Sequence, residues 1–374
     1  MRRHIDYYFL ILVGLLILFG TLFLSTLSAQ ESLKFFGNTN YYLFHQLTSV
    51  VIGLALALIL LKIPLSFLKK AAPVLLVINL ILLILVFMPY VGIKFWGAKR
   101  WISIGNNTFQ PSEFLKITSV LYLSALLSNR LSDSSKKGLT SLIKKGYYNF
   151  IKIFLPFLFL LAVIAIILYL QKDVSTMGII GVTLIMIYFA ARTPFWHTLF
   201  TFISGIAVLF LFVVVEPYRI ERLKTLLNPE SDPLGKGLQI KQSLIALGSG
   251  GIFGKGWGMS TQKFGFLPQT MSDSVFAIFG EEMGIIGGLI IIVLFLLFLW
   301  GGFKIARKCT DTFSKLTTVG ISTWIALQAL VNIASIIGLF PLSGIPLPFF
   351  SYGGSHIIAE LIGVGILLNI SKNG

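Results

Sequence analysis

The sequence predicts an all-α polytopic membrane protein that crosses the bilayer about ten times. Of its 374 residues, 56% are hydrophobic and only 12% are charged, whereas a soluble domain carries roughly 25% charged residues. A helix that crosses a bilayer uses about 20 apolar residues, so the apolar residues of the chain suffice for roughly ten crossings. This composition excludes a disordered chain and a soluble enzyme with one membrane anchor. The single cysteine, Cys309, excludes a disulfide scaffold.

Ten apolar segments account for these crossings in chain order. Helices are the expected form, because backbone groups in lipid must pair within their own segment and these runs exceed the strands of a membrane barrel. No internal repeat is evident in the sequence, which argues against an inverted-repeat transporter. The segments cover about 8–29, 44–62, 72–89, 110–128, 153–170, 176–191, 195–215, 276–300, 316–339 and 355–371.

The basic residues predict the orientation of these spans, because cytoplasmic connections are enriched in Lys and Arg. With the N-terminus inside, the short outer connections hold five basic residues, and the inner connections hold seventeen. Both termini are therefore expected in the cytoplasm. The net charge of +16 then reflects orientation and not nucleic-acid binding. The outer set is Lys34, Lys94, Lys99, Arg100 and Lys172; the inner set is Arg2, Arg3, Lys62, Lys69, Lys70, Arg130, Lys136, Lys137, Lys144, Lys145, Lys152, Arg192, Lys304, Arg307, Lys308, Lys315 and Lys372.

The first apolar run resembles a signal peptide in having two arginines ahead of it. It is longer than a typical cleaved signal and nine further spans follow, so it is interpreted as an uncleaved first helix. The basic, Ser-rich stretch 128–152 is expected to be a cytoplasmic loop that is partly amphipathic along 140–152. The stretches 90–112 and 340–355 are expected to be outer connections.

One long extracellular loop, residues 216–275, is expected between the seventh and eighth spans. A loop of this length is uncommon in a compact protein unless it is functional. Residues 234–248 have a weak helical pattern, whereas the Gly-rich stretch 248–258 is not expected to form a regular helix. The glycines either bring backbone N–H groups close to an anionic ligand or form a plain flexible loop. Most charges of the loop, including those of Arg222 and Lys236, are interpreted as local ion pairs.

Several acidic residues fall within the predicted spans. Glu113 and Lys116 lie three residues apart on one helix face and are expected to neutralise each other as a structural pair. Glu360 lies inside the tenth span, where an ionisable group is either functional or paired with a buried cation. Glu281 and Glu282 fall in the first turns of the eighth span, where the helix dipole stabilises acidic side chains. This interpretation is preferred to a role in a site.

Two aspartates lie at the outer ends of spans. Asp173 is expected to cap the helix that follows it. Asp273 closes the long loop among uncharged neighbours, so its pKa is expected to be raised, which suits it to accept a proton. An N-cap for the eighth span is an equal interpretation of Asp273.

The sequence shows no cluster with the spacing of metal ligands. Its four histidines (His4, His45, His197 and His356) are far apart, and no Ser–His–Asp or Cys–His pattern is readable. Cys309 is expected on the inner side and inert.

Three outer segments resemble the motifs of the SEDS family, the FtsW, RodA and SpoVE polymerases of bacterial cell-wall synthesis. They are WGAKRWISIGNNTFQPSEFLK (96–116), NPESDPLGKGLQIKQSLIALGSGGIFGKGWGMSTQKFGFLP (228–268) and GLFPLSGIPLPFFSYGGS (338–355). The chain departs from the family's patterns at QKDVST, LPQTMSDS and YGGSH, yet it keeps Asp173 and Asp273. Within the family it is similar to FtsW, the division member, more than to RodA.

The resemblance implies a single SEDS-type membrane domain over 1–374 that polymerises lipid II at the outer face of the cytoplasmic membrane. The aspartate that matches Asp273 is the family's catalytic residue, and it would act as the general base on an acceptor sugar hydroxyl. The leaving group, undecaprenyl pyrophosphate, needs cations nearby, or a divalent ion such as Mg or Mn. The expected substrate-binding residues are Lys99, Arg100, Arg219, Lys255, Lys263, Gln239 and Ser355.

The resemblance also implies a class B penicillin-binding transpeptidase as partner, together with other membrane proteins of the divisome or elongasome. Two alternatives stay open. A lipid II flippase would use the intramembrane charges of Glu113, Lys116 and Glu360, and a scaffold would only position the transpeptidase. A polymerase requires its key acid at the outer face, whereas a flippase requires a polar path that reaches both faces.

Overall fold

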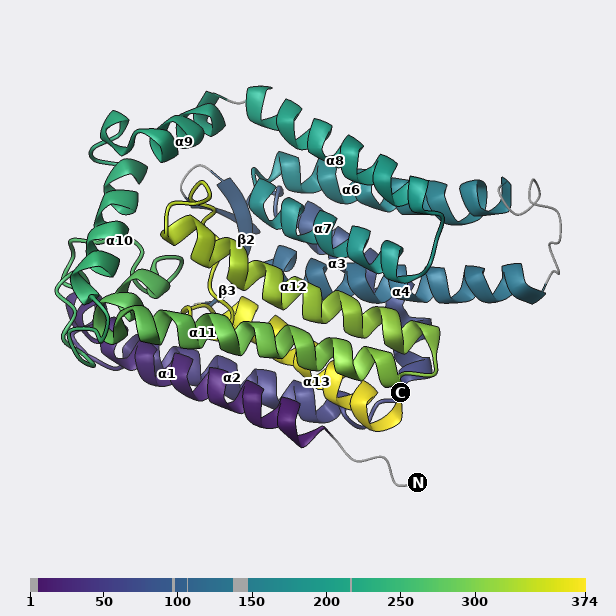
Figure 1. Ribbon diagram of the computed structural model, residues 1–374, viewed down its shortest axis with the longest axis horizontal. Helices are drawn as coiled ribbons and strands as arrows, with labels where there is room; N and C mark the ends of the chain where they lie inside the picture. Colours follow the sequence, from purple (N-terminus) through teal and green to yellow (C-terminus); the bar gives the residue numbers. More distant parts are fainter. Residues whose placement is uncertain (1–5, 96–97, 106, 137–146, 216) are drawn as a thin grey trace.

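The computed structural model describes residues 6–95, 98–105, 107–136, 147–215 and 217–374. Long helices that lie side by side form most of the molecule (Figure 1). They are α1 (Tyr7–Phe36), α2 (Tyr41–Leu60), α3 (Leu65–Leu85), α4 (Pro111–Lys136), a π-helix (Asn149–Phe154) that continues into α6 (Leu155–Leu170), α7 (Val174–Ala190), α8 (Phe195–Val215), α9 (Pro217–Leu227), a 3-10 turn (Pro229–Ser231), α10 (Lys236–Gly250), α11 (Val275–Lys308), α12 (Thr312–Ile336) and α13 (Gly354–Asn373).

A helix occupies each of the ten predicted spans, so the predicted fold class is confirmed. Seven helical stretches in the described part of the chain are long and apolar enough to cross a membrane, and α7 and the start of α8 are shorter apolar helices. The chain is therefore a multi-pass membrane protein. Several spans run longer than predicted; for example, α1 extends to Phe36 and α11 extends to Lys308.

The two ends of the bundle differ in what they carry. The backbone N–H of Asp6 donates to Ser371 Oγ at 3.3 Å, so the first and last helices meet at one end, here called the termini end. The opposite end, here called the loop end, carries α9, α10 and the irregular segment 251–274 (Figure 1). The prediction that both termini share one side is confirmed, and the cytoplasmic identity of that side stays a prediction.

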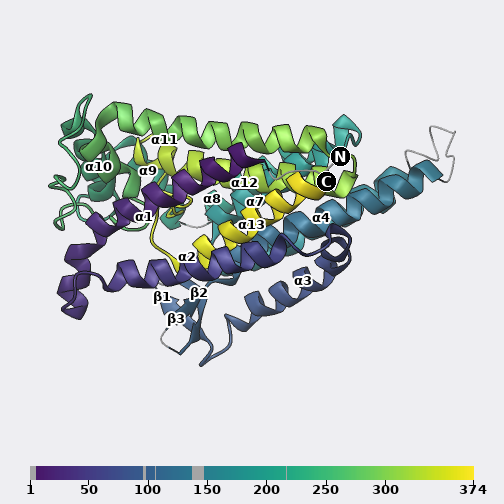
Figure 2. The same cartoon turned by 90° about the horizontal axis from the view of Figure 1, so that it is seen from below.

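The centre of the bundle is formed by α12 and α13, whose apolar spans are largely buried. Figure 2 shows α2 running along α13. A Cβ atom added to Gly365 of α13 would lie 2.6 Å from the Cα atom of Ala57 in α2. Small residues at this contact let the two backbones approach closely, which is how helices gain packing energy within lipid.

The connection 90–112 contains a small sheet that the sequence analysis did not predict. It folds as an antiparallel three-stranded sheet in the order β1 (Gly92–Phe95), β2 (Ala98–Ile104) and β3 (Asn107–Phe109). Ile102 of β2 pairs with Gly92 on one side and Phe109 on the other. The β-branched and aromatic residues of these strands fit the half-buried surface of a small sheet.

Two long connections contain more helix than expected. At the termini end, α4 continues to Lys136, whereas residues 140–146 of the predicted amphipathic stretch 140–152 lie outside the described residues. In the long loop, α10 confirms the helix expected over 234–248, and α9 adds a second helix. The chain leaves regular helix after Gly250, as the Gly-rich stretch predicts.

Candidate active site

Asp273 lies at the loop end, two residues before α11 begins, and is partly buried. Its Oδ2 accepts a hydrogen bond from Gln239 Nε2 at 3.3 Å, and its Oδ1 accepts one from Ser272 Oγ at 3.2 Å. Its backbone carbonyl accepts from Asn332 Nδ2 at 2.8 Å. The N-cap of α11 is Ser274, with no side-chain cap hydrogen bond. The N-cap interpretation of Asp273 is therefore wrong, and the carboxylate is held by side chains from the loop.

Burial raises the pKa of Asp273, as its uncharged neighbours predicted. Hydrogen bonds from its own backbone, Gln239 and Ser272 lower this pKa in part, and the charge of Lys236 adds a smaller effect in the same direction. The net shift remains upward from the ordinary value, about 3.9 for Asp. A carboxylate with a raised pKa is a stronger base than an exposed one, so this group is suited to remove a proton.

Three cations form what is here called the cation cluster: Lys236, whose charge acts on Asp273, and Arg100 and Arg222, whose charges act on Lys236. The pKa of Lys236 is lowered to about 8, chiefly by burial and also by repulsion from Arg222 and Arg100, whereas the charges of Asp273 and Asp232 partly offset this. Lys236 therefore interacts electrostatically with all of these charges. A group of positive charges beside a base is the arrangement that stabilises a departing anion.

Two members of the cation cluster were not expected in the site, because their spacing in the sequence indicates local ion pairs within the loop. Arg222 in α9 donates from Nη1 to the carbonyl of Leu342 at 3.2 Å. Lys236 is the first residue of α10, and its backbone N–H donates to Asp232 Oδ2 at 2.8 Å. Asp232 thus fixes the start of α10, which fixes where Lys236 emerges. Only the folded loop brings Lys236 to Asp273 and Arg222 to Lys236.

Arg100 reaches the cluster from β2. Its Nε donates to the carbonyl of Gln171 at 3.3 Å, its Nη2 donates to the carbonyl of Lys172, and its Nη1 lies 3.8 Å from Asp173 Oδ1. Asp173 also accepts from the backbone N–H of Thr176 at 3.4 Å, so its predicted role as the cap of α7 is confirmed. The small sheet therefore positions Arg100 over the turn between α6 and α7.

The segment between α12 and α13, residues 337–353, joins the parts of the site. The backbone N–H of Tyr352 donates to the carbonyl of Met271 at 2.7 Å, two residues before Asp273. Asn332 Nδ2 also donates to the carbonyl of Ile345 at 2.8 Å. Ser355, a predicted substrate ligand, accepts at Oγ from the backbone N–H of Gln110 at 3.0 Å. These bonds tie the 337–353 segment to the residues on both sides of the site.

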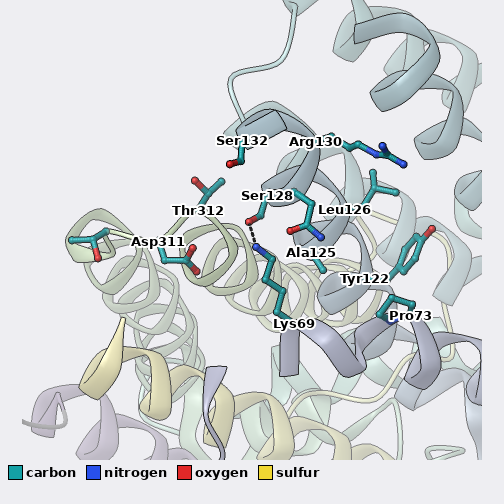
Figure 3. A pocket seen from close by; sticks show the side chains of 12 residues that line it. Lys69, Pro73, Tyr122, Ala125, Leu126, Ser128, Arg130, Ser132, Asp311 and Thr312 are labelled. Atoms are coloured by element: carbon teal, nitrogen blue, oxygen red, sulfur yellow. Dashed lines mark hydrogen bonds between the residues drawn. The ribbon is translucent and has the colours of Figure 1, made fainter. Parts of the chain in front are cut away.

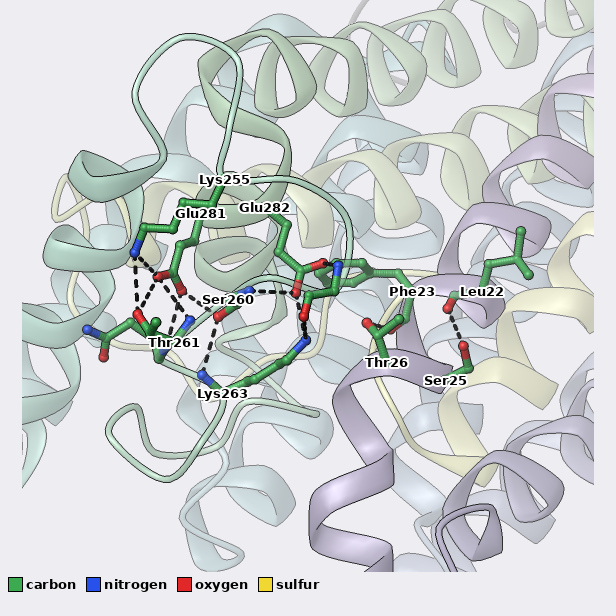
Figure 4. Close-up of polar contacts among 12 residues, drawn as sticks. Leu22, Phe23, Ser25, Thr26, Lys255, Ser260, Thr261, Lys263, Glu281 and Glu282 are labelled. Atoms are coloured by element: carbon green, nitrogen blue, oxygen red, sulfur yellow. Dashed lines mark hydrogen bonds and ion pairs between the residues drawn. The ribbon is translucent and has the colours of Figure 1, made fainter.

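Lys255 and Lys263, also predicted as substrate ligands, are paired with acids of α11 (Figure 4). Lys255 Nζ lies 2.6 Å from Glu281 Oε1, and Lys263 Nζ lies 3.0 Å from Glu282 Oε1. Glu282 Oε2 also accepts from the backbone N–H of Gly258 at 2.7 Å. Both glutamate side chains are almost fully buried. They anchor the segment 251–263, which corrects the expectation that they serve the helix dipole.

A kink in α11 creates the place where this segment binds. At Gly284 the backbone has φ 68° and ψ −169°, which interrupts the helix. The carbonyls of Glu281 and Glu282 accept instead from the N–H groups of Lys255 and Gly256, at 2.9 and 3.0 Å. The N–H of Ile285 donates to the carbonyl of Gly251 at 3.0 Å. The loop backbone thus satisfies groups that the kink would leave without partners.

The other two predicted substrate cations lie in different surroundings. Arg219 is 6% exposed, donates from Nη1 to the carbonyl of Phe212 at 2.5 Å and lies 5.2 Å from the ring of Tyr169. Lys99 Nζ donates to the carbonyl of Phe87 at 3.4 Å. These contacts tie Arg219 to α6 and α8 and Lys99 to the end of α3. Their roles as substrate ligands stay predictions.

The predicted pair Glu113–Lys116 is present and buried, at 3% and 2% exposure. Lys116 Nζ lies 2.8 Å from Glu113 Oε2 and donates to Gln328 Oε1 at 2.8 Å. Glu360 is buried nearby in α13 and accepts at Oε2 from the backbone N–H of Phe349 at 2.9 Å. These contacts connect α4 to α12, and α13 to the 337–353 segment.

A divalent ion stays a prediction. Among the described residues, no three His, Cys, Asp or Glu side chains gather as a set of metal ligands.

Known proteins match the chain along nearly its whole length. The FtsW/RodA/SpoVE family, described as cell cycle protein, matches residues 6–374. The stage V sporulation protein E of Bacillus subtilis (strain 168) is 36% identical over 98% of this chain and 97% of its own. A probable peptidoglycan glycosyltransferase FtsW of Trichlorobacter lovleyi is 37% identical over 98% of this chain and 93% of its own.

A solved structure shows the same fold. It is a chain from work on "structural coordination of polymerization and crosslinking by a peptidoglycan synthase complex", and it superimposes with a TM-score of 0.78 and 25% identity. The match covers 99% of this chain and 98% of that one. The resemblance inferred from the three outer motifs is thereby confirmed. This chain belongs to the FtsW/RodA/SpoVE family of cell cycle proteins.

Proposed function

We propose that this chain is a peptidoglycan glycosyltransferase that polymerises lipid II into glycan strands. The observation that carries the proposal is a partly buried carboxylate with a raised pKa, Asp273, beside the cation cluster at the loop end. Relatives named as probable peptidoglycan glycosyltransferases support it. The excess of basic residues in the connections of the termini end supports an active site on the outer side of the cytoplasmic membrane.

In the proposed reaction, Asp273 takes the proton of an acceptor sugar hydroxyl as its oxygen attacks the anomeric carbon of the donor. The bond from that carbon to the diphosphate breaks, and undecaprenyl pyrophosphate leaves with the electron pair. Arg100, Arg222 and Lys236 stabilise the charge that develops on the leaving diphosphate. Gln239 holds the base by its hydrogen bond to Oδ2. A positioned base contributes roughly 10²–10⁴ in rate.

The partner is proposed to be a class B penicillin-binding transpeptidase. The work on the matched structure concerns a complex that coordinates polymerization with crosslinking. The similarity to FtsW sequences supports a role in cell division.

The test uses Asp273→Asn in purified full-length protein supplied with lipid II, and it resolves product length on a gel. We expect the variant to lose at least about 100-fold in polymerisation rate while it keeps the melting temperature of the parent. Glu230→Gln, an exposed acid of the same loop, serves as control and should keep full activity. Parental turnover by Asp273→Asn would exclude Asp273 as the base.

The same assay separates the alternatives. A scaffold yields no glycan from the wild-type chain alone and yields product only with an active partner. A flippase moves lipid II across the bilayer of a vesicle without polymerising it into glycan. The buried Glu113–Lys116 pair lies in a packed helix contact, which favours a structural role over a headgroup path.

A further inference from the structure

A cavity of about 760 Å³ opens at the termini end, at the opposite end of the bundle from Asp273. Figure 3 shows its lining. It lies between α3, α4 and the start of α12. Its lining includes Lys69 from α3, Ser128 and Arg130 from α4, and Asp311 and Thr312 from α12. The reaction proposed above uses none of these residues.

The depth of the cavity corresponds to the level of lipid headgroups. Ser128 follows Pro111, the first residue of α4, by 17 positions, which is about 26 Å along a helix at about 1.5 Å per residue. The hydrocarbon core of a bilayer is about 30 Å thick. Since Pro111 lies at the loop end, Ser128 and Lys69 lie near the opposite interface.

The cations of the cavity are available to a ligand. Lys69 Nζ donates to Ser128 Oγ at 2.7 Å, and this bond holds the ammonium group at the cavity wall (Figure 3). No ion pair within 4.0 Å involves Lys69 or Arg130 in the described part of the chain. Asp311, the acid of the lining, already accepts from the backbone N–H and the Oγ of Ser314, at 3.0 and 3.1 Å, as the cap of α12.

Apolar surface runs from the cavity toward the middle of the bundle. Pro73 and Leu126 form part of the lining. Beyond them, α3 exposes Val74, Val77 and Ile78, which a membrane would cover. A phosphate ligand with acyl chains therefore matches both the charged wall and the apolar flank, whereas a soluble phosphate matches only the wall.

We infer that this cavity binds the phosphate of an anionic phospholipid, with Lys69 and Arg130 as its ligands and the acyl chains along α3. Basic pockets between membrane helices recognise lipid headgroups in this way. Hydroxyl groups of Ser128 and Thr312 can donate to the remaining phosphate oxygens. The inference does not depend on the glycosyltransferase activity.

The test titrates the purified full-length protein with phosphatidylglycerol, phosphatidylcholine or inorganic phosphate and counts bound molecules by native mass spectrometry. We expect a phosphatidylglycerol adduct that phosphatidylcholine does not reproduce. In Lys69→Gln/Arg130→Gln the affinity should fall by roughly tenfold or more, because each basic residue near a membrane surface is worth about 1 kcal/mol. Arg130→Gln alone, at the partly exposed end of α4, provides a milder variant if the double variant does not fold.

The control is Lys70→Gln/Arg307→Gln, which removes the same charge from two exposed positions that do not line the cavity. It should bind phosphatidylglycerol as the parent does. Equal losses in the two double variants would show a diffuse surface attraction and overturn the site. Binding of inorganic phosphate with no preference for phosphatidylglycerol would overturn the inference that the bound phosphate group belongs to a lipid.

Discussion

Lys236 should set the alkaline limit of polymerisation. Its pKa is lowered to about 8, so the cation is lost as pH rises through about 8, and kcat/KM should fall there. Asp273 has a raised pKa, so kcat/KM should also fall as pH drops and the base becomes protonated. Lys236→Arg should abolish the alkaline limb, because arginine stays charged at such pH, while the acid limb remains.

The measurement is the pH profile of kcat/KM for lipid II, since this ratio reports the free enzyme. Lys241→Arg, at an exposed position of the same helix, is the matched control and should keep both limbs. An unchanged alkaline limb in Lys236→Arg would show that another group sets it.

The proposed base, Asp273, could be predicted from the sequence, and the cations of the cation cluster at Arg222 and Lys236 could not. Asp273 stands out because it is a lone carboxylate among uncharged neighbours at the end of a span, where burial of an ionised group is costly. Arg222 and Lys236 share their loop with several acids, so sequence spacing favoured local ion pairs. Their placement in the candidate site depends on how α9 and α10 fold and on the hydrogen bond from Arg222 to the carbonyl of Leu342. No local sequence pattern encodes that long-range hydrogen bond.

At the scale of elements, the break in α11 should be required for the loop to bind. A Cβ atom at Gly284 would lie 2.4 Å from the backbone N of Gly254 and from the carbonyl O of Ile252, and its φ of 68° disfavours any side chain. Gly284→Ala should therefore destabilise the protein by at least about 1–3 kcal/mol and lower polymerisation, because segment 251–263 loses its backbone partners.

The melting temperature and the polymerisation rate of Gly284→Ala test this expectation. Gly248→Ala in α10, where a Cβ atom meets nothing within 4 Å, is the control and should be neutral or slightly stabilising. If both variants melted alike, the kink would have no special role.

The helical elements were more predictable than the irregular ones. A span in lipid must be helical, so ten apolar runs sufficed to locate ten helices. The small sheet was missed because its strands are short and lie between two spans, although the Trp and Ile residues of KRWISI and the GNN stretch after it are strand and turn signals. The helix break at Gly284 has no sequence signal beyond a glycine, and glycines are common in membrane helices.

At the scale of the whole molecule, composition determined the class and the folded contacts determined the site. Hydropathy and the distribution of basic residues suffice to predict ten spans with both termini together. The site joins β2, the neighbouring helices α9 and α10, and the 337–353 segment, which come from three distant parts of the sequence. Their convergence depends on how the helices pack, and the family motifs indicated it only through resemblance.

The packing of α4, α12 and α13 should depend on the buried pair Glu113–Lys116, in which Lys116 also binds Gln328. Lys116→Met leaves the Glu113 carboxylate buried without a cation and should cost about 3–5 kcal/mol of stability. Glu113→Gln should be similarly destabilising, because it leaves the Lys116 ammonium group buried without an anion. The double variant Glu113→Gln/Lys116→Met removes both charges together and should melt above either single variant.

Thermal unfolding of the purified protein measures this coupling between the two sites. Lys70→Met, at an exposed position of α3, is the control and should change stability by less than about 0.5 kcal/mol. Strictly additive losses in the double variant would mean that the two charges do not stabilise each other. A double variant that recovers stability but not polymerisation would show that the pair has a role in binding substrate besides its structural role. The helices would then still pack although both charges were gone.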